Sequence, residues 1–331
     1  MSIILNRILP FKFENQCIEY IQKGKKDILK IADTNVLINR LIDYGASSQI
    51  FSTNLDLIIK ITLPYENEIL ALDKAYTCVR DNLTCHFIVC YGFSKCSNIS
   101  FNTSINKSKK TKLTASKTSR TTKSSNDFND MVNSLVSFHE YIKQFYENIL
   151  LIFLEQFDDN MLNVIYHDTI QYNDNMIKSA FTQMILAIAS FHYLVQAIHD
   201  DAQLKNFFIK KDKNYDASSK AYLHYNICGE DIYLRYYGFI IVLADYGNVN
   251  FEFDNNQIKL IKDYEYILDD RLFKKCFQRE IDVNKVMQHP NMTEAKFLSY
   301  MKDTIFKNEN IFRTSIEKHS KVINPIPYVI Y

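Results

Sequence analysis

The hydrophobic pattern of the first hundred residues predicts a β-sheet with one helix. Short β-branched runs divided by turn-forming residues cover residues 33–42, 49–52 and 57–63. Thr53, Asn54 and Asp56 mark a tight turn between the last two runs, and Pro64 ends the third. Apolar residues then recur at helical spacing, and a further β-branched run covers residues 86–93. We therefore expect an antiparallel meander, a helix and another strand.

The second half of the chain has mainly helical periodicity. An amphipathic pattern begins at Phe128 and leads into an apolar run over residues 149–157, which predicts a buried strand. Hydrophilic residues at positions 158–160 interrupt the pattern, and the chain from there to Ile198 is mostly helical in its periodicity. The fold class is therefore predicted to be α+β, with a sheet-rich part over residues 1–157 and a helical part over residues 158–331.

One segment, residues 97–127, has no periodicity at all. It consists almost wholly of Ser, Thr, Asn and Lys, so it can bury too little apolar surface to offset the entropy of ordering. We predict a disordered insertion. The segment is also basic, and a solvated loop is favoured over a tail that docks a partner or nucleic acid.

Composition narrows the class of protein. Apolar residues make up 47% of the chain, with 23 Phe and 22 Tyr, which is typical of a packed core. The 39 basic and 38 acidic residues nearly cancel, so nucleic acid could bind only through the basic insertion.

Cysteine usage and hydropathy bear on the compartment. Seven cysteines without a C-x-x-C pair indicate neither a disulfide framework nor a zinc cluster, which favours an intracellular, reducing compartment. The apolar stretch 180–198 contains several polar residues, so we expect a buried helix and no membrane partner. His86, His139, His192 and His224 stand singly among apolar residues and are predicted to be core histidines.

The strongest motif begins at His199 and reads H-x-D-x-x-x-x-N, with Asp201 and Asn206 in its last two fixed positions. It comes after a helical pattern and enters a hydrophobic strand, and it resembles the catalytic loop of protein kinases. Asp200 stands where those kinases most often have Arg, which puts activation by a phosphorylated segment in doubt. His199 is expected to brace the loop and to transfer no proton.

Two further elements extend the resemblance. An apolar strand pattern over residues 239–244 runs into Asp245-Tyr246-Gly247, which looks like the kinase D-F-G element with Tyr for Phe. The stretches 222–230 and 237–246 are similar to the extended hairpin of haspin-like kinases, which also carry Asp-Tyr and lack an A-P-E element. Similar divergent kinases occur in large DNA viruses, for which host cytoplasm or the virion would be the location.

The same resemblance supplies nucleotide-binding candidates in the first half. Residues 42–51 align with a degraded glycine-rich loop, and the strand after it places a lysine where kinases hold the α- and β-phosphates. A glutamate on the next helix would hold that lysine. Adenine would lie against Glu155 and Phe157, in the segment that connects the two parts of the chain and that we call the connector. The candidates for binding the nucleotide or holding the lysine are therefore Asp43, Gly45, Ala46, Ser48, Ile50, Lys60, Glu68, Glu155 and Phe157.

The resemblance implies a bilobal protein-kinase-like fold, with an antiparallel-sheet N-lobe over residues 1–157 and a helical C-lobe over residues 158–331. It implies an ATP- and Mg²⁺-dependent kinase that phosphorylates Ser or Thr hydroxyls of a protein substrate. Asp201 would align the hydroxyl, Lys60 held by Glu68 would orient the phosphates, and Asn206 and Asp245 would bind magnesium.

Two other functions stay open. The degraded glycine loop and the missing A-P-E element are also compatible with a pseudokinase scaffold that binds a partner through its lobes and the basic insertion. A small-molecule kinase shares H-x-D-x-x-x-x-N but usually has a different pattern after its magnesium aspartate. We rank the protein kinase first, because all five of its polar positions are present together.

Overall fold

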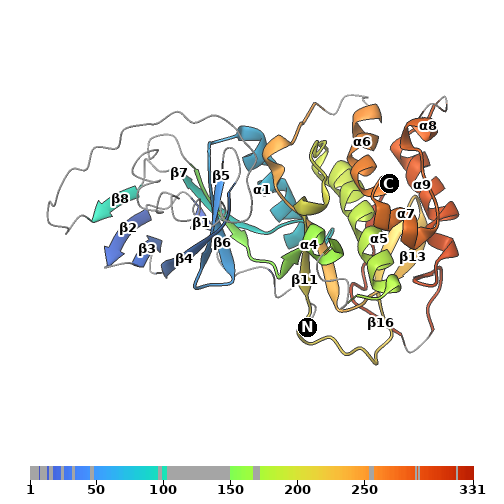
Figure 1. The fold of residues 1–331 in the computed structure, drawn as a ribbon, viewed down its shortest axis with the longest axis horizontal. Coiled ribbons are helices and arrows are strands. Elements are labelled where there is room, and N and C mark those ends of the chain that lie inside the picture. The colour runs from blue at the N-terminus through green and yellow to red at the C-terminus, as the bar shows by residue number, and fades with distance from the viewer. Residues whose placement is uncertain are drawn as a thin grey trace, which may run out of the picture. The chain divides into compact units, whose positions relative to one another are not determined.

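The computed structural model divides the chain into two compact units. The larger unit comprises Met1–Phe11, Tyr65–Tyr91 and Leu154–Tyr331, and the smaller unit comprises Lys12–Pro64 and Gly92–Phe153. The described residues are 7, 13–14, 18–23, 26–31, 34–44, 48–95, 99–102, 150–166, 172–252, 257–287, 289, 291–317 and 320–331. Helices and strands both contribute, which confirms the α+β class (Figure 1). The bilobal arrangement and the boundary at residue 157 stay predictions.

The smaller unit is built on an antiparallel meander of five strands. These strands are rich in apolar and β-branched residues, and Leu57, Ile59 and Ile61, which point to one face of the last strand, are fully buried. The strands are β2 (Ile18–Lys23), β3 (Lys26–Ile31), β4 (Thr34–Tyr44), β5 (Ser48–Thr53) and β6 (Leu57–Thr62). Neighbours in this order pair antiparallel throughout. The last three strands match the predicted runs, whereas β2 and β3 were not predicted.

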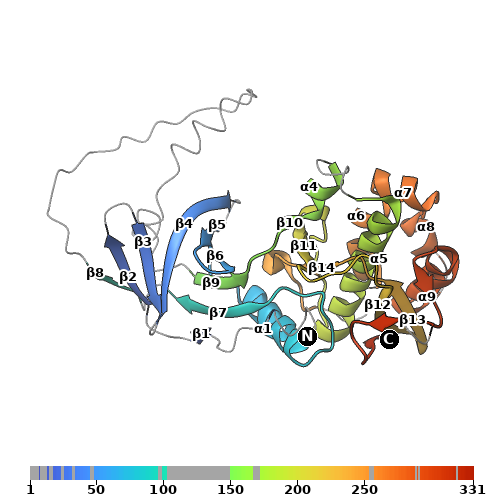
Figure 2. The same ribbon diagram turned by 90° about the horizontal axis from the view of Figure 1, so that it is seen from below.

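Further strands extend the sheet on both sides. They are β1 (Phe13–Glu14), β7 (Cys90–Lys95), β8 (Ile99–Asn102) and β9 (Leu150–Glu155), and the strand order is β1-β7-β9-β6-β5-β4-β3-β2-β8 (Figure 2). The strand predicted over residues 86–93 thus begins only at Cys90. The buried strand predicted over residues 149–157 is confirmed by β9, in which every residue is buried.

The prediction of disorder from residue 97 onward is wrong for its first part. Residues 99–102 form β8, which pairs parallel with β2 in the register Ile18↔Ile99. Ile99 and Phe101 give this short stretch enough β-forming character to join an existing sheet edge. The rest of the predicted insertion, 103–127, and the helix predicted from Phe128 lie outside the described residues.

Helix α1 (Glu66–Arg80) belongs to the larger unit. It begins after Pro64, carries Glu66 and Glu68 in its first turn, and buries one face that includes Glu68, Leu72 and Val79. Lys74 Nζ donates to the carbonyl of Val195 at 2.9 Å. This helix is therefore fastened to the second half of the chain.

The centre of the larger unit is helix α5 (Asp174–Ser190), which continues as a π-helical turn, η3 (Phe191–Val195). Asn173 caps α5 by accepting a hydrogen bond from the Met176 N–H at 3.0 Å. Every residue from 179 to 190 is buried, which confirms the buried helix predicted over this stretch. None of the helices in the described part of the chain is long and apolar enough to span a membrane.

Two small sheets flank α5. One contains β10 (Asp159–Asn160), β11 (Phe207–Lys211) and β14 (Phe239–Leu243), all antiparallel. The other contains β12 (Ala221–Ile227), β13 (Glu230–Arg235), β15 (Phe312–Arg313), β16 (Lys321–Val322) and β17 (Tyr328–Ile330). Most of β12 lies in the stretch 222–230 that was compared with haspin-like kinases, whereas β13 lies mostly between that stretch and 237–246. The pairing of β16 and β17 with β12 was not predicted.

The remaining described helices complete the larger unit. They are α4 (Met161–Tyr166), η4 (Leu204–Asn206), η5 (Tyr246–Asn248), α6 (Gln257–Leu268), α7 (Arg271–Phe277), α8 (Val283–Met287), α9 (Glu294–Thr304) and η6 (Phe306–Asn308). Asp270 and Thr293 cap α7 and α9 with side-chain oxygens. Helices α6 and α9 each supply a buried carboxylate that contacts His192 of η3, and the one from α6 also contacts the loop that follows.

Candidate functional site

The loop that carries the H-x-D-x-x-x-x-N motif is held in place by hydrogen bonds of its backbone amide groups. The amide groups of His199 and Asp200 donate to the two carboxylate oxygens of Asp263, at 2.7 and 2.9 Å. Asp200 has a φ of 59°, in the left-handed region that costs a non-glycine residue free energy. Ile198 pairs with Asn250 on the other side. Asp263 therefore holds a strained turn directly before Asp201.

The structure brings Asp201 and Asn206 together. Asn206 Nδ2 donates to the Asp201 carbonyl at 2.8 Å and to Asp201 Oδ2 at 3.0 Å. Gln203 Nε2 donates to Asp201 Oδ1 at 2.6 Å. Both carboxylate oxygens thus have side-chain donors, which restrict the carboxylate to one orientation.

Asp245 reaches the same place from the neighbouring strand. β14 pairs with β11 in the register Phe207↔Leu243, and the Ala244 amide donates to the Asn206 carbonyl at 3.0 Å. Asn206 and Asp245 consequently lie next to each other at one end of these strands. Asp245 has a φ of 63° and an exposed side chain. We call Asp201, Asn206 and Asp245 together the acidic cluster.

Tyr246 and His199 form the apolar support beneath the acidic cluster. Tyr246 is fully buried, donates to the Leu243 carbonyl at 3.0 Å and packs against the rings of Phe191 and His199. His199 Nε2 donates to the Ala244 carbonyl at 3.0 Å, and burial lowers the pKa of this histidine. A neutral, hydrogen-bonded imidazole at this position fits a bracing role.

Glu68 lies on the helix that contacts the segment after Asp245. The neighbouring Asn67 donates from Nδ2 to the Val249 carbonyl at 3.1 Å, and α1 packs along η5. Glu68 itself is buried, with 2% of its surface exposed. The structure thus places this glutamate in the same unit as the acidic cluster.

The connector residues are held by an ion pair that was not predicted. The Arg7 guanidinium donates to the Glu155 carboxylate from Nε at 3.1 Å and from Nη2 at 2.8 Å, and to the carbonyls of Cys85 and Phe87. Burial alone would lower the pKa of Arg7, but the Glu155 carboxylate raises it, so the guanidinium stays charged. The Glu155 carboxylate is therefore already engaged in contacts within the protein.

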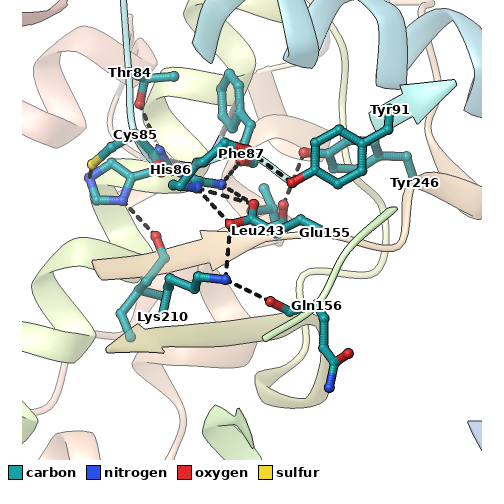
Figure 3. Close-up of polar contacts among 12 residues, drawn as sticks. Thr84, Cys85, His86, Phe87, Tyr91, Glu155, Gln156, Lys210, Leu243 and Tyr246 are labelled. Atoms are coloured by element: carbon teal, nitrogen blue, oxygen red, sulfur yellow. Dashed lines mark hydrogen bonds and ion pairs between the residues drawn. The ribbon is translucent and has the colours of Figure 1, made fainter. Parts of the chain in front are cut away.

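Lys210 of β11 also contacts the connector residues (Figure 3). Its ammonium group lies 3.4 Å from Glu155 Oε1 and donates to the Gln156 carbonyl at 2.8 Å. The same group lies over the Phe157 ring, which stacks on Phe208 with a centroid distance of 5.3 Å. Because the Glu155 carboxylate is occupied, adenine could meet this segment only through backbone groups and the Phe157 ring.

The smaller unit aligns its nucleotide-binding candidates. Asp43 of β4 pairs with Ile50 of β5, and Ile50 pairs with Lys60 of β6. Directly opposite residues of neighbouring strands point to the same face, and Ser48 shares that face through its two-residue spacing from Ile50. These four candidates therefore share one face of the sheet. Gly45 and Ala46 lie outside the described residues.

His192 is a buried core histidine, as predicted, but its partners are charged. His192 is fully buried between two carboxylates, with Nε2 at 2.9 Å from Asp263 Oδ2 and Nδ1 at 2.6 Å from Glu294 Oε1. Its neighbours in the sequence are apolar, so local pattern gave no sign of partners 71 and 102 residues away. His86 also fits the prediction: it is buried and bonds the Ile241 carbonyl and the Tyr225 hydroxyl.

Metal binding by a cluster of ionisable ligands finds no support in the described parts of the chain. No group of three or more His, Cys, Asp or Glu side chains there is arranged to hold a metal ion. Within the acidic cluster, Asn206 and Asp245 offer an amide oxygen and a carboxylate, hard oxygen donors that suit magnesium shared with phosphate oxygens.

Comparisons with known proteins add a distant structural similarity. No protein-family model matches the chain, and no curated protein matches it in sequence. Among solved structures, the chain is similar to one described as WaaP in complex with acyl carrier protein, with a TM-score of 0.39 and 12% sequence identity. The similarity covers 82% of this chain and 89% of that chain.

Proposed function

We propose that this protein is an ATP- and magnesium-dependent kinase that transfers phosphate to Ser or Thr hydroxyls of a protein substrate, with a haspin-like catalytic loop. The observation that supports it best is the acidic cluster. Asp201 and Asn206 come from the loop and the 3-10 turn before β11, and Asp245 follows β14. Hydrogen bonds and the β11–β14 register bring the three residues together. Phosphate transfer needs such a fixed set of oxygen ligands beside a carboxylate that orients the attacking hydroxyl.

Asn206 and Asp245 fit a magnesium site. The Asn206 amide nitrogen makes both bonds to Asp201, so its oxygen is the end that remains for a cation. Asp245 adds an exposed carboxylate at the adjacent strand end. When bound, magnesium would neutralise charge on the nucleotide phosphates.

Asp201 is proposed to orient the substrate hydroxyl. Its carboxylate is held by Gln203 and Asn206, and its backbone comes directly after a turn fixed by Asp263. A group restrained in this way can meet a hydroxyl in one geometry, which is the main contribution that a protein makes to this reaction.

The remaining candidates are proposed to hold ATP. Lys60 would contact the α- and β-phosphates, with Glu68 as its partner, and the backbone near Gly45 and Ala46 would cover the phosphates. The shared face of Asp43, Ser48, Ile50 and Lys60 supports this assignment. Backbone groups near Glu155 and the Phe157 ring would receive adenine.

The test is transfer of labelled phosphate from ATP to a generic basic protein in the presence of magnesium. We expect the wild-type protein to phosphorylate Ser or Thr, and Asp201→Asn to lose transfer by about 100-fold or more, because an amide cannot accept the hydroxyl proton. Asp303→Asn, an exposed acid on α9, is the matched control and should retain activity.

The outcomes separate the alternatives. Magnesium-dependent ATP binding without transfer to substrate or to the protein itself would favour the pseudokinase scaffold. Transfer to small hydroxyl compounds but to no protein would favour a small-molecule kinase. Equal activity of wild type and Asp201→Asn would remove the proposed role of the acidic cluster.

A further inference from the structure

A buried ionic cluster lies against the loop that carries the H-x-D-x-x-x-x-N motif. It comprises His192 of η3, Asp263 of α6 and Glu294 of α9, each with at most 2% of its surface exposed. His192 bridges the two carboxylates, at 2.9 Å from Asp263 and 2.6 Å from Glu294. These three elements are far apart in the sequence, so the ionic cluster joins distant parts of the chain.

The contacts require His192 to be protonated. A neutral imidazole has one donor nitrogen and one acceptor nitrogen, so it would turn a lone pair toward one of the carboxylates. Burial by itself lowers the pKa of His192, but Glu294 and Asp263 outweigh it and raise the pKa to about 9. The imidazolium is thus the cation that allows two carboxylates to be buried side by side.

One end of the ionic cluster reaches the catalytic loop. The Asp263 carboxylate that meets His192 also accepts the amide groups of His199 and Asp200. Asp200 needs these bonds, because its φ of 59° is unfavourable for an aspartate with no compensating contact. The next residue is Asp201, so the orientation of Asp263 determines where the catalytic carboxylate starts.

The other end reaches the last residues of the chain. Glu294 Oε1 also accepts from the Tyr264 hydroxyl, and Glu294 Oε2 accepts from the Tyr331 hydroxyl. Tyr331 comes directly after β17, and its ring lies 5.1 Å from that of Tyr193. The groups that face His192 or its partners in the described residues therefore include two carboxylates, two tyrosine hydroxyls and two backbone amides.

We propose that His192, in its protonated form, is a positioning residue of the phosphate transfer: it holds Asp263 in the orientation that fixes the His199–Asp200 backbone and thereby Asp201. This inference rests on the proposed function. Loss of the proton would leave two buried carboxylates without the positive charge between them, and the repulsion between them would displace Asp263. The turn at Asp200 would then relax, which moves Asp201 without touching the nucleotide.

The first test compares wild type, His192→Gln and Glu294→Gln over pH 6 to 10. In wild type, kcat should fall on an alkaline limb near pH 9, the pKa that the cluster gives His192. In Glu294→Gln the limb should move to lower pH, because one of the two carboxylates that stabilise the imidazolium is gone. His192→Gln should lower kcat about 10- to 100-fold at pH 7 with the KM for ATP unchanged, as expected for a misplaced catalytic group.

Controls distinguish positioning from general damage. His224→Gln, a histidine of β12 outside the ionic cluster, should keep the wild-type kcat and alkaline limb. A merely structural role for the cluster would lower the folded fraction of Glu294→Gln without moving its limb, and an unmoved limb overturns the proposal. Should His192→Gln fail to fold, the limb of Glu294→Gln still decides.

A second readout needs no activity. Nitrogen chemical shifts of His192 should show an imidazolium at pH 7 that titrates near pH 9, and the Asp200 amide should lose hydrogen-exchange protection in His192→Gln. A neutral His192 at pH 7, or an Asp200 amide that stays equally protected, overturns the inference. If the protein transfers no phosphate, the proposed function fails, and these two measurements still decide whether the cluster holds the loop.

Discussion

Asp245 has a backbone conformation that matters as much as its carboxylate. Its φ of 63° lies in the left-handed region, which Asp and Asn tolerate better than other non-glycine residues. The side chain is exposed beside Asn206, at the end of the β11–β14 pair. Substitutions of Asp245 can therefore test the backbone conformation and the carboxylate charge separately.

We predict that Asp245→Asn abolishes magnesium-dependent phosphate transfer and leaves the melting temperature nearly unchanged. An amide keeps the left-handed backbone but is a much poorer magnesium ligand. Asp245→Ala should lose transfer as well, with an additional destabilisation of about 1 kcal/mol from the backbone. Full activity of either variant would remove the magnesium assignment.

Arg7 gives a prediction of stability at the same scale. Arg7→Ala would leave two carbonyl groups buried without their donor and the buried Glu155 carboxylate with Lys210, at 3.4 Å, as its cation, so unfolding free energy should fall by about 3 kcal/mol. The double variant Arg7→Met/Glu155→Leu should lose less, because neither charge remains. Chemical denaturation measures both, and a double variant less stable than the single one would contradict this account.

At the scale of elements, two turns of the β12–β14 region differ in how strictly they need glycine. Gly229 joins β12 to β13 with a φ of 84° and open space around it. Gly238 precedes β14 with a φ of 79°, and a Cβ there would lie 2.4 Å from the Tyr215 ring. Gly229 is required only by its backbone conformation, whereas Gly238 is required by its backbone conformation and by the close packing of Tyr215.

We therefore expect Gly238→Ala to destabilise the protein clearly more than Gly229→Ala. The Gly229 variant should cost about 1–2 kcal/mol, the penalty for a left-handed L-residue. The Gly238 variant adds a clash that the Tyr215 ring can relieve only by leaving the ring of Tyr236, on which it packs. Thermal unfolding of the two variants, made in the same background, provides the comparison.

At the scale of the whole molecule, two buried histidines set opposite limits of pH on stability. Burial lowers the pKa of His86 to about 4, while the carboxylates around His192 raise its pKa to about 9 despite burial. An unfolded histidine titrates near pH 6.5. His86 therefore opposes folding as pH falls below about 6.5, since only the unfolded chain binds that proton readily.

For His192 the sign is reversed. The folded protein binds its proton more tightly than the unfolded chain does, so its stabilising contribution is complete below about pH 6.5 and is lost as pH rises through about 9. We predict that unfolding free energy passes through a maximum near neutral pH. Urea unfolding at pH 5, 7 and 9.5 tests this, and a stability that rises steadily toward pH 9.5 would contradict the protonated His192.

The candidate site was predictable where its residues are close in the sequence. The H-x-D-x-x-x-x-N spacing identified Asp201 and Asn206 as candidates, although it did not predict the hydrogen bond between them. The β-branched runs likewise predicted β4, β5 and β6, and in the structure Asp43 pairs with Ile50 and Ile50 with Lys60. Local periodicity and turn chemistry are sufficient to predict such strands.

The sequence by itself thus determined the H-x-D-x-x-x-x-N motif, the strands β4, β5 and β6 and the burial of α5. Tertiary structure alone decided the Arg7–Glu155 pair, the bridge from His192 to Asp263 and Glu294, and the pairing of β17 with β12. These contacts join residues from about 70 to 150 positions apart, at separations over which side-chain periodicity carries no information. Such pairs form because folding brings buried charges and strand edges from distant parts of the chain into contact.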